Sequence, residues 1–199
     1  MARHRKGADG PPPGICVALL APDGAGKSTL AAELARGWPG PGRTTHLGLY
    51  PSGERRIAVP GLRLAVRIAR LWRGYALGRW WRARGGLVVF DRYPYEALLA
   101  PTVHTSLPNR LRRAVLSRSL PAPDLVVILD APGEVLAARK DEHSAAELED
   151  QRQAYRALAG ALPTPVAVVD AARPLADVRR DVADAVWRAS LDRRRRHVR

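Results

Sequence analysis

The residues best suited to chemistry form a short glycine-rich segment, Asp23-Gly24-Ala25-Gly26-Lys27-Ser28-Thr29, which follows the apolar run Ile15–Leu20. In the P-loop pattern, a glycine, four further residues and Gly-Lys-Ser or Gly-Lys-Thr connect a strand to a helix. Gly24 and Gly26 let successive N–H groups turn toward phosphate oxygens, and the next helix adds its positive dipole end. We therefore expect Lys27 to contact the β and γ phosphates of a nucleoside triphosphate, and Ser28 to bind Mg²⁺.

One position departs from the pattern, because Ala21 occupies the place of its first glycine. A methyl group is tolerated there if the backbone φ angle is negative, since L residues rarely adopt positive φ. The sequence thus predicts an ordinary backbone conformation at Ala21.

A second group with chemical potential is Asp91-Arg92-Tyr93, which comes directly after the apolar run 87–90. An aspartate at the end of a strand beside the P-loop strand is placed to bind Mg²⁺ or to act as a base. The planar guanidinium of Arg92 suits a phosphate, although a simple ion pair with Asp91 is the plainer interpretation. Because a P-loop is present, we expect both residues to be functional.

A third group is Arg139-Lys140, at the start of the charged stretch 139–153. Phosphoryl transfer needs cations over the γ phosphate as charge moves, and a mobile basic lid can supply them. A solvated helix with ordinary Glu–Arg pairs explains the same residues equally well. Arg139 is the candidate catalytic residue of this lid.

Apolar runs suited to buried strands alternate with helical patterns along the whole chain. Strands are expected over 15–20, 44–50, 87–90, 125–129 and 166–169, and helices over 28–36, 61–84, 109–120, 134–140, 145–161 and 175–191. This alternation predicts the α/β three-layer sandwich of the P-loop NTPases, with a parallel sheet of about five strands and helices on both faces. Three strands are followed by an aspartate (Asp91, Asp130 and Asp170), at the edge where such sheets bind ligands.

The domain organisation expected from the sequence is simple. Residues 1–13 predict a disordered basic arm, 14–191 a single kinase domain with its lid near 139–153, and 192–199 a basic tail. Both terminal segments lack the apolar content to join a core, so we expect activity without them. The helix over 61–84 is expected to break near Gly74 or Gly78.

Composition indicates which partners, cross-links and cellular location to expect. The formal net charge of +14 favours anionic partners, and the single cysteine, Cys16, excludes a disulfide framework or a cysteine metal site. The basic start lacks the apolar segment of a signal peptide, so a cytoplasmic protein is expected. The arginine-rich helix 61–84 is interpreted as packing in a core or a homodimer interface; membrane binding and RNA binding are the less favoured interpretations. Nucleic acid and membrane are thus not expected as partners.

In order along the chain, the motifs resemble the thymidylate kinase family. The resemblance covers roughly residues 15 to 190. Besides the P-loop and Asp91-Arg92-Tyr93, it is carried by 129–135 (Leu-Asp-Ala-Pro-Gly-Glu-Val), 139–140 (Arg-Lys), 151–156 (Gln-Arg-Gln-Ala-Tyr-Arg) and 169–175 (Val-Asp-Ala-Ala-Arg-Pro-Leu).

The resemblance implies a set of roles. ATP is expected on the P-loop with Mg²⁺, Arg92 on the acceptor phosphate, Asp23 near the acceptor sugar, and Arg139 over the transferring group. The segment from Asp170 to Pro174, which includes Ala171, is expected near the adenine. Residues 47–84 do not match the segment that shapes the thymine pocket in the family, and this predicts poor acceptance of thymidine monophosphate.

The leading interpretation is therefore ATP-dependent phosphorylation of a small acceptor, namely a nucleoside monophosphate. A kinase of another small metabolite, such as a nucleoside or a sugar derivative, is the second interpretation. A third, non-catalytic P-loop protein that binds nucleotide or nucleic acid is disfavoured, because a binder does not need Asp91, Arg92 and a lid. A GTPase is disfavoured because no Asn-Lys-x-Asp motif follows any strand.

Overall fold

The computed structural model describes the chain except for residues 1–12, 49–59, 100–106, 141–142 and 198–199. The strands are β1 (Ile15–Leu20), β2 (Gly42–His46), β3 (Leu87–Asp91), β4 (Leu125–Asp130) and β5 (Val166–Asp170). The helices are α1 (Lys27–Gly37), α2 (Pro60–Ala83), α3 (Leu107–Ser117), α4 (Gly133–Arg139), α5 (Ala145–Ala161) and α6 (Leu175–His197), with a 3₁₀ helix, η1 (Pro94–Leu98), that the sequence patterns did not indicate. Residues 1–12 of the arm expected over 1–13, and residues 141–142 of the expected lid, thus lie outside the described residues.

The strands form one sheet in the order β2-β3-β1-β4-β5, and every described pairing is parallel. The strand β1, which leads into the P-loop segment, lies in the centre between β3 and β4. Asp91 therefore ends a strand directly beside the one that leads into the P-loop. The predicted parallel sheet of about five strands is confirmed.

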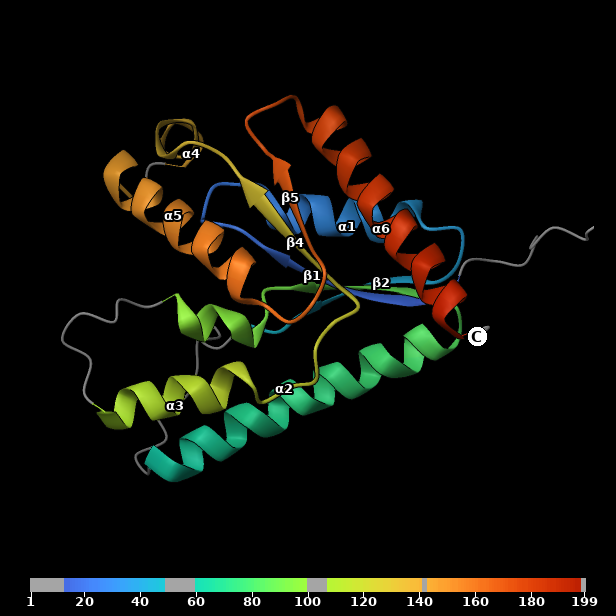
Figure 1. Cartoon of the computed structure of the whole chain (residues 1–199), viewed down its shortest axis with the longest axis horizontal. Coiled ribbons are helices and arrows are strands. Elements are labelled where there is room, and N and C mark those ends of the chain that lie inside the picture. Colours follow the sequence, from blue (N-terminus) through green and yellow to red (C-terminus); the bar gives the residue numbers. More distant parts are fainter. Residues whose placement is uncertain (1–12, 49–59, 100–106, 141–142, 198–199) are drawn as a thin grey trace, which may run out of the picture.

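Helices cover both faces of the sheet, as predicted (Figure 1). Side chains of β1 alternate between two cores, and each is at most 1% exposed. One core holds Ile15, Val17 and Leu19 with residues of α1 and α6, and the other holds Cys16, Ala18 and Leu20 with residues of α2, η1, α3 and α5. Burial on both faces explains why β1 is a continuous apolar run.

Helix α2 continues without interruption, so the expected break near Gly74 or Gly78 is wrong. A Cβ at Gly74 would lie 2.8 Å from Leu47 Cδ2, and one at Gly78 would lie 2.9 Å from the ring of Phe90. The two glycines therefore bring the helix close to β2 and β3, and this packing outweighs their low helix propensity. Within the described part of the chain, no helix is both long and apolar enough to cross a membrane.

The last helix does not end at residue 191 as expected, because α6 continues to His197. Arg193 makes the extension useful to the fold: its Nη1 donates to the carbonyl of Gly14 at 3.0 Å, and its Nε lies 3.4 Å from Asp124 Oδ1. Asp124 also accepts from the backbone N–H of Cys16 at 2.8 Å and pairs with Arg82. The start of the supposed tail thus helps to fix the first strand.

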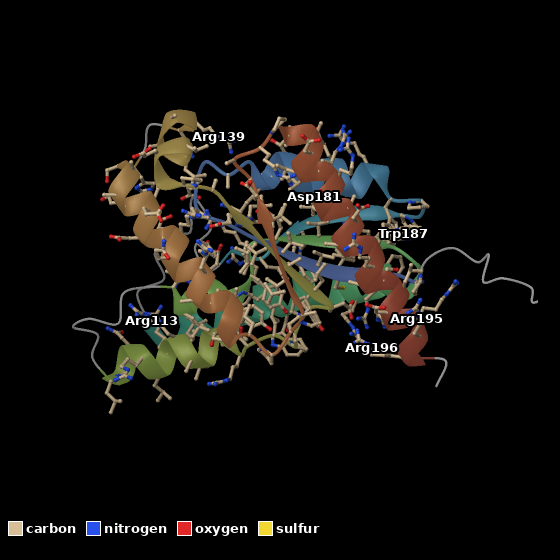
Figure 2. All side chains as sticks on the ribbon, turned by 45° about the horizontal axis from the view of Figure 1, so that its top comes forward. Arg113, Arg139, Asp181, Trp187, Arg195 and Arg196 are labelled. Carbon is tan, nitrogen blue, oxygen red and sulfur yellow. The ribbon has the colours of Figure 1, made fainter. Side chains whose placement is uncertain are left out.

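We expect Arg193→Ala to lower the free energy of unfolding by about 1 to 3 kcal/mol, because it leaves a half-buried carboxylate and a carbonyl with fewer partners. Urea unfolding measures the change. Arg195→Ala, which alters an exposed side chain two residues later (Figure 2), is the matched control and should leave stability nearly unchanged. Equal stabilities of the two variants would show that the contacts of Arg193 contribute nothing.

Candidate active site

The P-loop segment has the backbone that its glycines predict. Gly24 and Gly26 have φ angles of +83° and +77°, which L side chains rarely adopt. A Cβ on Gly24 would also lie 3.0 Å from the carbonyl oxygen of Leu136 in α4. Among the described residues Arg92 alone combines a side chain with positive φ, so Ala21 has the ordinary backbone expected for it.

Lys27 is folded back onto this loop and is 8% exposed. Its Nζ donates to the carbonyls of Ala21 at 2.7 Å and Pro22 at 2.8 Å, and lies 3.5 Å from Asp23 Oδ1. Burial, together with the charge of Arg92, lowers the pKa of Lys27, although Asp23 opposes the shift. The ammonium is thus held in the loop that is expected to enclose phosphates.

Ser28 and Asp91 meet as a magnesium site requires. The Ser28 hydroxyl donates to Asp91 Oδ2 at 3.0 Å, although the two residues are 63 positions apart in the chain. Hydroxyl and carboxylate oxygens are hard ligands that suit Mg²⁺ when phosphate oxygens complete its shell. No cluster of three or more His, Cys, Asp or Glu that could hold a metal by itself is present in the described part.

Arg92 contacts the same carboxylate oxygen of Asp23 that lies near Lys27. Its Nη2 donates to Asp23 Oδ1 at 2.8 Å, and its Nη1 donates to Glu96 Oε2 at 3.2 Å. Burial alone would raise the pKa of Asp23, but the charges of Lys27 and Arg92 hold it below its ordinary value. Asp23 therefore joins the residue expected at the donor to the residue expected at the acceptor.

A cavity of about 770 Å³ opens at Asp23, and its described lining does not include Lys27 or Ser28. Its polar lining includes Asp23, His46, Arg92, Glu96, Asn109, Arg112, Arg113, Gln151 and Tyr155. This volume falls in the range of small-molecule sites. None of the described side chains of α2 is part of the lining, so the described arginines and the Trp80-Trp81 pair of that helix do not build this cavity.

Arg139 is placed differently from the other expected catalytic residues. Its Nη1 donates to the carbonyl of Ala171 at 3.0 Å, so the structure joins the expected lid arginine to the segment expected near the adenine. Figure 2 shows Arg139 at the end of α4 and Arg113 on α3, far from each other. No described contact brings Arg139 to Lys27 or Arg92, and its catalytic role stays a prediction.

The three aspartates that end strands have different partners. Asp91 meets Ser28, whereas Asp130 accepts from Arg152 Nε at 2.7 Å and Nη2 at 3.1 Å. Asp170 accepts from the backbone N–H of Ala172 at 2.9 Å, within its own turn. The position at the sheet edge was therefore predictable, but only Asp91 faces the P-loop.

Two residues at this site carried no role in the sequence interpretation. Glu96 binds Arg92, and Tyr155 donates from its hydroxyl to Glu96 Oε1 at 2.9 Å. The spacing of four between Arg92 and Glu96 was a signal for the first contact, whereas nothing in the sequence linked Tyr155 to η1. Asn109 and Arg112 likewise line the cavity from α3, a helix to which the sequence assigned no role.

Three features together define a P-loop kinase. They are a parallel sheet with a P-loop, a Ser28–Asp91 contact beside that loop, and an adjoining cavity large enough for a phosphate acceptor. Comparison with curated proteins gave thymidylate kinases of Pseudomonas entomophila strain L48 (33% identical, 90% of this chain and 98% of the relative), Pseudomonas putida strain F1 (32%, 90% and 98%) and Xanthomonas campestris pv. campestris strain B100 (31%, 92% and 88%). Comparison with family models gave no match. The chain belongs to the thymidylate kinase family, and it is a nucleotide kinase.

Proposed function

We propose that this enzyme transfers the γ-phosphoryl group of ATP to the phosphate of a nucleoside monophosphate. The observation that carries the proposal is the position of Asp23, because its Oδ1 lies within ion-pair distance of both Lys27 and Arg92. A donor on the P-loop and an acceptor in the cavity would therefore meet beside one carboxylate. The full-length similarity to thymidylate kinases supports the same reaction.

On the donor side, the proposed roles follow from charge. Lys27 leaves the loop carbonyls for the β and γ phosphates, where it stabilises charge as the bond between the γ phosphorus and the β-phosphate oxygen breaks. Ser28 and Asp91 are the residues that would hold Mg²⁺, which would neutralise phosphate charge when bound. Ala171 and its neighbours would contact the adenine, and a lid around 139–153 would close over the phosphates. Both would belong to a single domain that begins near residue 14 and includes α6.

On the acceptor side, Arg92 would bind the acceptor phosphate, one oxygen of which forms the new bond to phosphorus. The products are ADP and a nucleoside diphosphate. A phosphate monoester is largely deprotonated at neutral pH, since its second pKa is about 6, so the attacking oxygen needs no base. This removes the alternative role of Asp91 as a base and leaves its role as a metal ligand.

The proposal also concerns which base the acceptor nucleoside monophosphate carries. The relatives' name, thymidylate kinase, makes thymidine monophosphate the first acceptor to measure. The poor match of 47–84 predicts that it reacts less well than another nucleoside monophosphate; residues 49–59 of this stretch lie outside the described part. Values of kcat/KM, measured for thymidine monophosphate and for the other nucleoside monophosphates, show which acceptor is preferred. If thymidine monophosphate gives the highest value of all, the sequence-based prediction is contradicted.

We also propose that the enzyme works as a homodimer in the cytoplasm. Helix α2 exposes Leu62, Val66, Trp72, Leu77 and Trp80, each more than 40% accessible. At 3.6 residues per turn these side chains share one half of the helix, opposite the half that packs on β2 and β3. Figure 1 shows α2 along the lower edge of the molecule, where a second copy could cover it.

Leu77→Glu is expected to convert the dimer into a monomer at micromolar concentration, because it buries a charge in the proposed interface. Sedimentation velocity measures the change. Leu175→Glu, at an exposed leucine at the start of α6, is the matched control and should remain dimeric. A wild-type monomer, or a Leu77→Glu dimer, would contradict the proposed interface.

A further inference from the structure

Glu96 and Tyr155 hold the guanidinium of Arg92 through the nitrogen that does not contact the P-loop. Arg92 Nη1 donates to Glu96 Oε2 at 3.2 Å, and the Tyr155 hydroxyl donates to Glu96 Oε1 at 2.9 Å. Both carboxylate oxygens are thus engaged, and the Glu96 side chain is only 11% exposed. Glu96 is therefore an oriented anion in the wall of the acceptor cavity.

The backbone of Arg92 shows why this side chain needs support. Its φ angle is +68°, and such a conformation costs a residue with a side chain on the order of 1 to 3 kcal/mol. The backbone N–H donates to the carbonyl of Leu19 at 3.3 Å, and the guanidinium is bound at one nitrogen by Asp23 and at the other by Glu96. These contacts aim Arg92 into the cavity despite the unfavourable backbone.

Tyr155 is itself placed by a firmly anchored helix. One turn earlier on α5, Arg152 binds Asp130 at the end of β4 through two hydrogen bonds. Glu149 Oε2 accepts from the backbone N–H of Gly133 at the start of α4, at 3.0 Å. Burial and the neighbouring Glu96 carboxylate raise the pKa of Tyr155, so its hydroxyl remains a donor at neutral pH.

We infer that Glu96 and Tyr155 are positioning residues for the acceptor: Tyr155 orients Glu96, Glu96 fixes the guanidinium of Arg92, and Arg92 thereby presents its remaining N–H groups to the acceptor phosphate. The inference rests on the proposed role of Arg92 at the acceptor. A guanidinium has five N–H donors, so the two contacts leave donors for phosphate oxygens. Since the reacting atoms must meet within a narrow geometry, a loosened Arg92 weakens the acceptor and slows transfer.

The charge of Glu96 also has a physically reasonable opposite effect, namely repulsion of the acceptor phosphate. Asp23 and Glu96 together place two negative charges on one guanidinium, so Glu96 could repel a phosphate instead of organising its site. Positioning predicts that removal of the Glu96 charge raises the KM of the acceptor. Repulsion predicts that the same change lowers it.

The experiment compares Glu96→Gln and Tyr155→Phe with the wild type, using ATP and the nucleoside monophosphate that the wild type uses best. We expect the KM of the acceptor to rise roughly 10-fold or more for Glu96→Gln and about fivefold for Tyr155→Phe. The KM of ATP should stay within about twofold. Because Tyr155 acts through Glu96, the double variant should resemble Glu96→Gln.

Tyr95→Phe is the matched control, because Tyr95 is a buried tyrosine of η1 whose hydroxyl lies 3.5 Å from Thr164 Oγ1. It should leave both KM values nearly unchanged. An acceptor KM that is unchanged or lower in Glu96→Gln, or an ATP KM that rises in parallel, overturns the inference while the wild-type reaction stands.

If the wild type phosphorylates no nucleoside monophosphate, the proposed function fails, and the positioning of Arg92 is measured directly. Nitrogen-15 NMR of the arginine side chains reports rotation of the Arg92 guanidinium about its Nε–Cζ bond. Both variants should speed this rotation relative to Tyr95→Phe. Equal rotation rates would overturn the inference.

Discussion

Lys27→Ala is expected to lower kcat by a factor of about 100 to 1,000, the typical cost of removing one preorganised group aimed at the charge that develops. Lys27 is nearly buried and is held within the P-loop segment by two loop carbonyls and Asp23, partners that it would exchange for the β and γ phosphates. Coupled ADP formation at saturating ATP and acceptor measures kcat.

The matched control for Lys27 is Arg36→Ala, which removes an exposed cation from the last turn of the same helix. Its kcat should equal that of the wild type, and thermal unfolding should show that both variants are folded. A folded Lys27→Ala enzyme that keeps more than about a tenth of its kcat would refute the assignment of the P-loop as the catalytic centre.

Arg92→Ala is expected to raise the KM of the acceptor by about 10- to 150-fold, equivalent to about 1.5 to 3 kcal/mol for a charge-assisted contact. The KM of ATP should change little, because Arg92 lines the cavity whereas Lys27 is not part of its described lining. Arg92→Lys keeps the charge but cannot bind Asp23 and Glu96 with one planar fork, so it should also raise the acceptor KM.

Arg118→Ala is the control for this pair, since Arg118 is an exposed arginine of the segment after α3 and lines a separate groove. Its kinetics should match the wild type. A rise in the KM of ATP with an unchanged acceptor KM in Arg92→Ala would place Arg92 at the donor and reverse the map of the site.

The fold could be predicted closely where apolar runs are buried on both faces. The strands β1, β3 and β4 appear where the sequence indicated them, because a central parallel strand needs apolar side chains on each face. The edge strand β5, which is only partly buried, also appears where its apolar run indicated it. The expected break of α2 at its glycines was wrong because helix propensity is a local property. The close packing of these glycines against β2 and β3 depends on the tertiary structure instead. The end of α6 was missed for a similar reason, since Arg193 finds partners near β1.

The candidate site could be predicted where a motif fixes spacing within a few residues. Lys27, Ser28, Asp91 and Arg92 come together as expected, because the topology places β3 beside β1. Glu96 and Tyr155 were missed because their contact joins residues 59 positions apart on η1 and α5. A single sequence contains no signal for such a pairing, and the network around Arg92 therefore needed the structure.

The measurement that tests the central claim most directly is ATP turnover with matched acceptors. Thymidine monophosphate and the other nucleoside monophosphates are compared with the corresponding nucleosides and with phosphosugars. We expect ADP formation with at least one nucleoside monophosphate, and none with the corresponding nucleoside, because Arg92 requires a phosphate. Turnover of a nucleoside or a phosphosugar, with no turnover of any nucleoside monophosphate, would contradict this expectation.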